Sequence, residues 1–267
     1  LPDGVHCELS TDYHHLAVRN WLQVRRLASD NGYGVPREFD RALETALEFS
    51  LHVHQPSGVV PSFSDGDVRG FLPLLAQGAA LFDRGDMQFV ATDGAEGTPP
   101  HERVARFPNS GYHVLRSDWT SADAQHLVFD CGPLGEGNHG HFDALSFELA
   151  AFGNALIVDP GRYTYSESGE DVGPEAAEYR HRPPRGVSQL GSGPALTRNW
   201  RVHFRSTAAH NTVSVDGLNQ TRYVPKPIKE GSRHAHGSVR HKISGPPPET
   251  TLQEAHSGAR LDLLHGR

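Results

Sequence analysis

The sequence has 267 residues, enough for one large domain or two modest ones. Its 36% hydrophobic and 21% charged residues are ordinary for a globular protein, and its apolar runs are too short to span a bilayer. With a net charge of −7 and no basic patch, the sequence predicts neither a nucleic-acid partner nor a membrane partner, and it gives no oligomeric state.

Residues 1–92 are expected to be helical. The first helix is predicted from an apolar stripe at three- to four-residue spacing, made of Ala17, Trp21, Val24 and Leu27. A second helix should start at Pro36, with an apolar face of Phe39, Leu43, Ala46, Leu47 and Leu51. A third is expected over 68–81. Helical pairs of this kind build α/α toroids, although three helices cannot close one.

A linker rich in Gly and Pro is predicted over 93–103, followed by a change to short strands. Strands are expected at 113–116, 127–129, 146–149, 155–158 and 212–215, the last running into the turn dipeptide Asp216-Gly217. Residues 104–267 are therefore expected to form an antiparallel β-sandwich, with a long insertion over 166–199. The whole is an α+β multidomain arrangement.

The strongest local signal is the alternation of His139, His141 and Asp143. In an extended chain these three side chains would share one face. Two imidazoles and a carboxylate on one face are typical of a metal site or of an acid/base site, and a polar sheet edge is the simpler alternative.

Two further residues extend this signal. Asp159 ends an apolar strand, and His210 directly precedes another predicted strand. Each alone would be an ordinary turn residue. Together His141, Asp159 and His210 form a ligand set suited to zinc.

A block of polar residues at the N-terminus, 3–14, precedes the first helix. Helix capping by Ser10, Thr11 or Asp12 is the simpler interpretation of this block taken alone.

Four blocks taken in order give a more specific interpretation. They are Asp-Gly-x-x-x-Glu-x-Ser-x-x-Tyr-His at 3–14, Gly-Asn-His-Gly-His-Phe-Asp-Ala-Leu-Ser-Phe at 137–147, Val-Asp-Pro-Gly-Arg-Tyr at 158–163 and His-Asn-Thr-Val-Ser-Val-Asp-Gly at 210–217. This order resembles the heparinase II/III-like polysaccharide lyases, a family that includes heparin/heparan sulfate lyases and oligoalginate lyases. The resemblance covers nearly the whole chain apart from 166–199.

The resemblance implies an N-terminal α/α toroid, of which this chain holds the last helices, and a C-terminal antiparallel β-sandwich with the active cleft between them. It implies that Tyr13 and His139 are catalytic, and that a structural zinc is held by His141, Asp159 and His210. Residues expected near the substrate are Glu8, His14, Arg162, Tyr163 and Tyr165.

The implied activity is β-elimination at a uronic acid of an acidic polysaccharide or oligosaccharide. Tyrosine and histidine suit the two proton transfers, and the charge that develops on the uronate must be stabilised. Family members use an asparagine upstream of the tyrosine for that purpose. The chain begins twelve residues before Tyr13, so we expect this asparagine outside the sequence.

The chain starts at Leu1 without a signal peptide, and an apolar stretch runs close to its end at Arg267. We expect both ends to be internal to a longer protein. Localisation is therefore not readable from the sequence itself, and the resemblance implies a secreted or periplasmic protein.

Two other interpretations stay open. A cupin-like metal-dependent enzyme fits loosely, because His139 and His141 are followed later by His210, but it leaves the Tyr13 block unexplained. A non-catalytic carbohydrate-binding homologue would keep the fold, and it is favoured if the full-length protein lacks the upstream asparagine.

Overall fold

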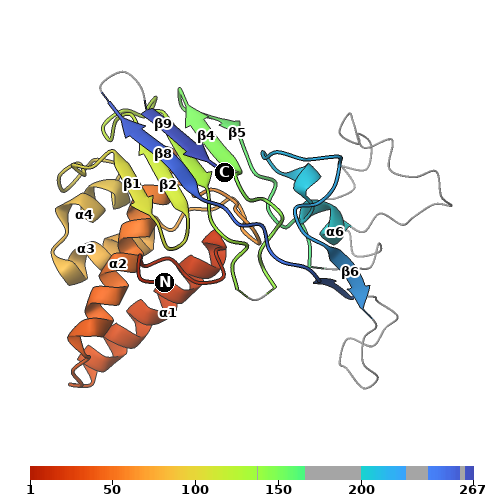
Figure 1. Ribbon diagram of the computed structural model, residues 1–267. Coiled ribbons are helices and arrows are strands. Elements are labelled where there is room, and N and C mark those ends of the chain that lie inside the picture. The colour runs from red at the N-terminus through yellow and green to blue at the C-terminus, as the bar shows by residue number, and fades with distance from the viewer. Residues whose placement is uncertain (137, 166–199, 227–239, 259–261) are drawn as a thin grey trace, which may run out of the picture.

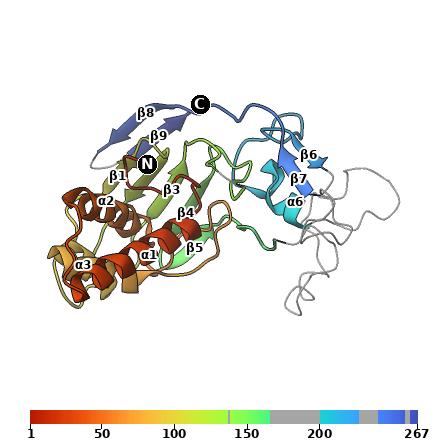
Figure 2. The same ribbon diagram turned by 90° about the horizontal axis from the view of Figure 1, so that it is seen from below.

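The computed structural model describes residues 1–136, 138–165, 200–226, 240–258 and 262–267. Helices α1–α4 cover one face of a five-stranded antiparallel sheet, and a β-hairpin, β8–β9, lies on the other side of that sheet (Figures 1 and 2). The expected combination of helices and antiparallel sheets is confirmed. The insertion predicted over 166–199 lies outside the described residues.

Helix α1 (Thr11–Asp30) buries a different face from the one predicted. Its buried residues are Thr11, His14, His15, Val18 and Leu22. The predicted stripe is wrong as the core face, because Trp21, Val24 and Leu27 are 36%, 52% and 56% exposed. Apolar spacing could not identify the buried face, since two histidines occupy it, each with at least one ring nitrogen hydrogen-bonded to the backbone.

Helix α2 (Arg37–Val53) agrees with its prediction: it follows Pro36 and buries Leu43, Ala46, Leu47 and Leu51. These leucines pack with Val18 and Leu22 of α1. Helix α3 (Leu72–Phe82) starts later than expected, with Val68 70% exposed ahead of it and Pro73 in its first turn. A short helix α4 (Gly85–Ala91) follows.

The five-stranded sheet is a meander in which each strand pairs with the next along the chain, in the order β1-β2-β3-β4-β5. Its strands are β1 (Val104–Phe107), β2 (Tyr112–Arg116), β3 (His126–Asp130), β4 (Phe147–Ala151) and β5 (Asn154–Ile157). Four of the five predicted strands are thereby confirmed.

The strand predicted at 212–215 is wrong. Only Val215 makes an isolated bridge, to Leu218, around the expected turn at Asp216-Gly217. Side chains hold this segment instead of a ladder: the Asn211 amide donates to the Val158 carbonyl, and Thr212 Oγ1 donates to the Ala144 carbonyl.

The remaining described elements are helix α6 (Trp200–Phe204), a 3₁₀ turn (Thr207–Ala209) and two hairpins, β6 (Tyr223–Lys226) with β7 (Arg240–Ile243) and β8 (Leu252–Ser257) with β9 (Asp262–Gly266). A complete β-sandwich stays a prediction. Within the described ranges, no helix combines the length and hydrophobicity needed to cross a membrane.

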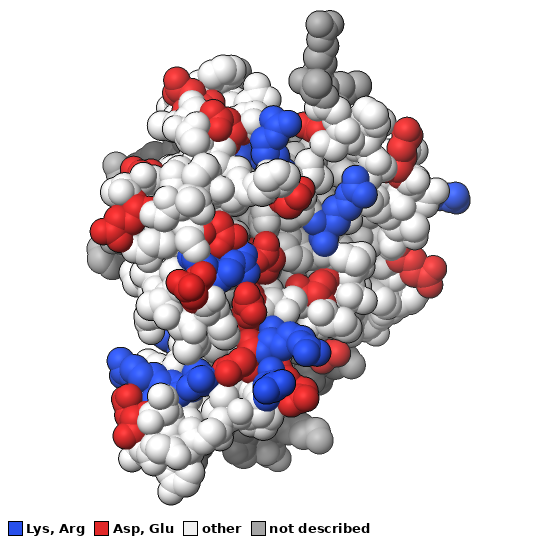
Figure 3. Space-filling view, turned by 90° about the vertical axis from the view of Figure 1, so that its left-hand side faces the viewer, with Lys and Arg blue, Asp and Glu red and all other residues white. Residues whose placement is uncertain are grey.

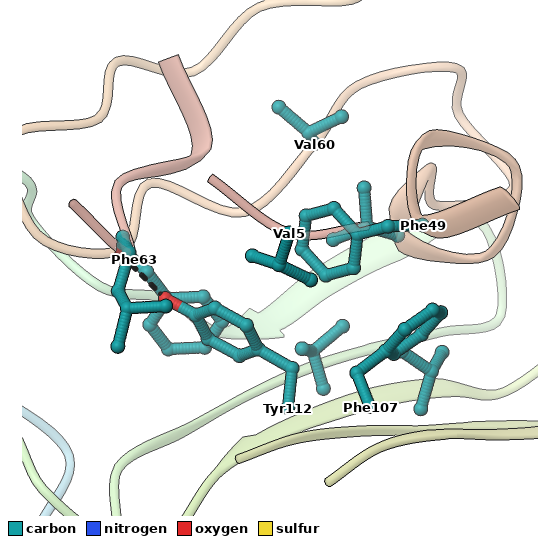
Figure 4. Packing of buried hydrophobic residues seen from close by; sticks show 10 residues of the cluster. Val5, Phe49, Val60, Phe63, Phe107 and Tyr112 are labelled. Atoms are coloured by element: carbon teal, nitrogen blue, oxygen red, sulfur yellow. Dashed lines mark hydrogen bonds between the residues drawn. The ribbon is translucent and has the colours of Figure 1, made fainter. Parts of the chain in front are cut away.

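A hydrophobic core joins the helices to the sheet (Figure 4). Phe49 of α2 packs edge-on against Phe107 of β1, with ring centroids 5.0 Å apart. The hydroxyl of buried Tyr112 donates to the Leu9 carbonyl at 2.6 Å. This bond anchors the segment just before α1, and therefore Tyr13, to the sheet.

The helical side of the molecule shows acidic and basic side chains interspersed (Figure 3). Arg84, for example, contacts Glu44, Glu48 and Asp86. On this face no single-sign patch has formed.

Candidate functional site

Two segments far apart in the sequence meet at the start of α1. The Glu136 amide donates to the Cys7 carbonyl at 2.8 Å. Gly135 has a φ of +76°, and a Cβ there would lie 2.5 Å from the Glu8 carbonyl oxygen, so only glycine allows this approach. The contact places Glu8 beside the loop that carries His139.

The two residues predicted to be catalytic lie together. The rings of Tyr13 and His139 are stacked, with centroids 3.9 Å apart and an angle of 12° between their planes. The Tyr13 hydroxyl is 2.9 Å from the Tyr165 hydroxyl, and Tyr165 also meets His139 edge-on at 6.4 Å. Burial and the Tyr13 hydroxyl raise the pKa of Tyr165, so its hydroxyl stays protonated.

A carboxylate orients the histidine. His139 Nδ1 is 2.6 Å from Glu8 Oε2, and both side chains are about a quarter exposed. A carboxylate can only accept, so Nδ1 carries the hydrogen and Nε2 remains for proton exchange. Glu8, predicted to bind substrate, thus contacts His139; its contact with substrate stays a prediction.

A cleft of about 390 Å³ opens beside these residues and is lined by Tyr13 and Tyr165. Three arginines also line it: Arg19, Arg69 and Arg162. The Arg162 guanidinium lies over the Tyr165 ring at 4.4 Å. Arginines beside aromatic rings are suited to binding the acidic groups of a saccharide.

One carboxylate, Asp67, holds two of these cations. Its Oδ2 lies 2.5 Å from Arg69 Nη2 and 2.5 Å from Arg162 Nη2. Asp12 contacts Arg69 at 3.0 Å, and burial raises the pKa of Asp12 to about 6 despite that cation. In the described part of the chain, Arg19 makes no ion pair and is exposed.

Two of the residues predicted to contact substrate lie elsewhere. The prediction for His14 is wrong: it is 1% exposed, Nδ1 accepts from the His6 amide, and Nε2 contacts the Ala46 carbonyl. Burial lowers the pKa of His14 to about 3, so it is a neutral core residue. Tyr163 stacks on Phe204 at 4.9 Å and is not among the residues that line the cleft, so its role stays a prediction.

The segment 138–143 is a loop, and the predicted extended arrangement with one shared face is wrong. His139 faces Tyr13, whereas His141 and Asp143 are buried in a second cluster with His210. His139 therefore stands apart from that cluster, contrary to what the cupin-like alternative requires.

The buried cluster has the composition of a metal site. One ligand atom from each of His141, Asp143 and His210 lies within 4.8 Å of the other two. His141 Nδ1, Asp143 Oδ2 and His210 Nε2 are buried without hydrogen-bond partners in the described residues. Unpartnered buried polar atoms are costly, and a zinc ion would satisfy all three.

Further carboxylates stand behind both imidazoles. Asp65 Oδ1 is 2.8 Å from His141 Nε2, and Asp159 Oδ2 is 2.7 Å from His210 Nδ1. Such partners fix the tautomer of a metal-binding histidine. Asp159, named as a ligand by the resemblance, thus contacts His210, while the geometry adds Asp143 to the candidate ligands.

The pKa of His141 agrees with this arrangement, whereas that of His210 is shifted the other way. Burial lowers the pKa of His141 to about 4, against the opposing effect of Asp65, so the ring is neutral as a ligand must be. For His210, burial lowers the pKa but Asp159 outweighs it, and the net shift is upward.

Sequence patterns missed Asp65 and Arg201. Arg201 of α6 pairs with both oxygens of Asp65 and lies 5.1 Å from the Tyr165 ring centroid. Asp65-Gly66-Asp67 looks like an ordinary surface turn in the sequence, and only the fold shows that it enters both clusters. The sole signal was two carboxylates flanking a glycine.

Comparison with known proteins supports a single family. The family model described as "Heparinase II/III-like, C-terminal" matches residues 99–267, and "Heparinase II/III N-terminus" matches residues 1–85. Two curated heparin-sulfate lyases are similar: one from Bacteroides stercoris is 28% identical over 84% of this chain, and one from Bacteroides thetaiotaomicron is 26% identical over 86%. The chain spans about a third of each relative, 31% and 32%.

Solved structures show the same likeness. A heparinase III structure superimposes with a TM-score of 0.67 at 28% identity, covering 85% of this chain and 32% of its own. A mutant of the heparan sulfate lyase HepC from Pedobacter heparinus shares the fold at 22% identity, with a TM-score of 0.69, and covers all of this chain and 34% of its own. The two family models together account for nearly all of the sequence, and the chain belongs to the heparinase II/III-like family.

Proposed function

We propose that this chain carries the tyrosine and histidine of a polysaccharide lyase that cleaves an acidic, uronate-containing polysaccharide by β-elimination. The observation that carries the proposal is the stacked pair of Tyr13 and His139 beside a cleft lined by three arginines. Because the chain spans about a third of its relatives, the activity is proposed for the natural protein in which this sequence occurs.

The reaction needs two proton transfers. A base removes the proton at C5 of the uronate, a C4–C5 double bond forms, and the C4–O bond breaks. An acid gives its proton to the departing oxygen. The product carries an unsaturated uronate at its new non-reducing end.

Glu8 suggests how the two roles are divided. It holds the hydrogen of His139 on Nδ1, which leaves the lone pair on Nε2 to accept the C5 proton. The Tyr13 hydroxyl, within reach of the Tyr165 hydroxyl, is then the donor to the departing oxygen. Tyrosine is suited to that role because its ordinary pKa, about 10, keeps it protonated at neutral pH.

The arginines supply positive charge for the acidic substrate. Arg162 and Arg69 lie at the cleft wall near Tyr165, and Arg19 lies on the same helix as Tyr13. A carboxylate in the cleft would gain charge-assisted hydrogen bonds from these guanidinium groups. We infer that they attract the substrate and orient it against Tyr13.

Zinc is proposed as a structural ion. His141 and His210 would hold it with Asp143, the residue the geometry favours over Asp159. When bound, zinc would join the loop 138–143 to the segment that precedes His210 and so stabilise the position of His139. None of the proton transfers passes through it.

The test is an assay of the natural protein on heparan sulfate, heparin, alginate and chondroitin sulfate, following the ultraviolet absorbance of the unsaturated uronate. Heparan sulfate comes first because the two curated relatives are heparin-sulfate lyases. Tyr13→Phe should lower kcat by about a hundredfold or more with the fold retained. Tyr33→Phe is the matched control, since Tyr33 is 73% exposed. Undiminished activity of Tyr13→Phe would contradict the proposal.

A further inference from the structure

A second cavity, of about 300 Å³, lies between the end of α2, the linker after α4 and the turn that follows β2. It shares no lining residue with the Tyr13 cleft. Its polar and aromatic lining residues include Gln55, Ser57, Asp93, Arg116, Trp119 and Ser121.

The unusual feature of this cavity is the charge of Arg116. The residue is 5% exposed, and its Nη2 donates to the His54 carbonyl. Nε is buried without a hydrogen bond, and no carboxylate of the described residues forms an ion pair with Arg116. Burial lowers the pKa of Arg116 to about 10, although the nearby charge of Asp118 acts in the opposite direction.

Other arginines of the molecule have the carboxylate partners that Arg116 lacks among the described residues. Arg201, also buried, is matched by both oxygens of Asp65, and Arg84 contacts three carboxylates. Arg116 instead stacks on the Trp119 ring, 4.0 Å from its centroid. Stacking on an aromatic ring compensates a guanidinium only partly and fixes its plane.

The fixed guanidinium faces a cavity with few competing charges. Asp93 is the only carboxylate in its lining, and it is exposed. Ser121 accepts from the Asp123 amide, so its hydroxyl hydrogen can be donated to a ligand. Ser57 adds a second hydroxyl at the exposed rim.

We propose that this cavity is a second binding site, which takes an oxyanion such as a sulfate group against Arg116. An oxyanion there would supply the direct ion pair that the described residues do not provide and would accept a charge-assisted hydrogen bond from the guanidinium. The site is separate from the proposed catalytic cleft, and its existence does not depend on lyase activity.

Trp119 offers a local signal for the test. The chain has three tryptophans, and only Trp119 stacks on Arg116. Sodium sulfate is titrated at constant ionic strength, balanced with chloride, while tryptophan fluorescence and the melting temperature are followed. In the parent protein, we expect both the fluorescence and the melting temperature to change with sulfate and to reach saturation. In Trp119→Phe, the fluorescence change should be absent, and the change in melting temperature should remain. A response that does not saturate, or that chloride reproduces, would overturn the proposal.

Two variants change the charge at the site. Arg116→Gln should weaken sulfate binding by about tenfold or more, the loss expected when a charged donor is removed. Asp93→Asn should tighten it by about two- to fivefold, because a repelling carboxylate is gone. Equal sulfate affinity in Arg116→Gln and the parent protein would overturn the site.

A second pair of variants, at Ala122, tests the site even if Arg116→Gln does not fold. Ala122 lines the cavity and is exposed, so Ala122→Glu adds a carboxylate where the fold tolerates it, and Ala122→Gln is its neutral match. Sulfate binding should be lost in the first and kept in the second; binding kept in both would overturn the site. A sulfated disaccharide that binds more tightly than inorganic sulfate would identify the ligand as a saccharide-borne group, and equal affinities would identify it as the free ion.

Discussion

The imidazole of His139 lies flat against the phenol of Tyr13, although the two residues are 126 positions apart in the chain. The pair exists because the loop that carries His139 is hydrogen-bonded to the segment just before α1, through Glu136 and Cys7. Proton transfers at Tyr13 and His139 would thus occur at two groups brought together by the contact between this loop and the segment before α1.

Glu8→Gln is predicted to lower kcat of the natural protein roughly tenfold or more, with a smaller effect on KM, because His139 loses the acceptor that fixes its tautomer. Nitrogen chemical shifts of His139 should show a mixture of tautomers in place of one with hydrogen on Nδ1. Glu38→Gln, at an exposed position of α2, is the control. A single unchanged tautomer in Glu8→Gln would show that Glu8 does not position the ring.

Asp67→Asn is predicted to lower KM for an acidic polysaccharide by about two- to fivefold at low salt, with little change in kcat. The reason is that Asp67 pairs with both Arg69 and Arg162: without its charge Arg162 is released for the substrate, and Arg69 keeps only its pair with Asp12. The gain should shrink as salt screens the charges. Asp40→Asn, which breaks an ion pair with Arg25 on the helices, is the matched control. An increased KM would mean that Asp67 orients the arginines for the substrate instead of competing with it.

The protein is predicted to bind one zinc ion per chain. Zinc should raise its melting temperature, since a metal that binds the folded state stabilises it. His141→Ala and Asp143→Asn should lose the metal, whereas His139→Ala should keep it. Asp159→Asn should keep a weakened site, roughly ten- to a hundredfold lower in affinity, because Asp159 supports His210. Metal lost in Asp159→Asn but kept in Asp143→Asn would instead establish Asp159 as the ligand.

Stability is predicted to fall as the pH drops from about 6.5. Burial lowers the pKa of His54 to about 4 in the folded protein, while unfolded histidine titrates near 6.5. Between these values the unfolded chain binds more protons, so the stability that neutral His54 contributes is lost on acidification, by at most roughly 1.4 kcal/mol per pH unit.

His54→Leu tests this. It should be less stable at neutral pH, because Ser50 and Phe71 lose their hydrogen-bond partner, and its unfolding free energy should fall less steeply with acid. Glu148, whose pKa burial raises to about 7, acts in the opposite direction between about 4.5 and 7, and comparison with the parent protein removes its effect. His101→Leu, at an exposed histidine, is the control. An unfolding free energy that falls with acidification as steeply as in the parent protein would contradict the prediction.

Helix α2 and four strands were predictable because their apolar periodicity follows the buried face. Helix α1 was not, because His14 and His15 lie on its core side, where both nitrogens of His14 and Nδ1 of His15 are hydrogen-bonded to backbone groups. Their neutrality results from burial, which no residue pattern records.

The candidate site, like the fold, contains residues that the sequence could predict and residues that it could not. Motif order brought out Tyr13, His139, His141 and His210, and the structure places them in two neighbouring clusters. The partners that orient them were not predictable, because Asp65 and Arg201 meet across 136 positions and neither stands in a recognisable pattern.

The buried carboxylate of Asp65 also has an evolutionary consequence. It comes from the helical segment, yet it pairs with His141 and Arg201 of the sheet segment, where the side chains of Asp65 and His141 are fully buried. Recombination at the linker would join a helical segment from one relative to a sheet segment from another. Where the incoming segment lacked this carboxylate, a buried arginine would lose its partner at a cost of about 3–5 kcal/mol. The two segments are therefore expected to be inherited as a unit, even though the linker between them looks like a natural crossover point.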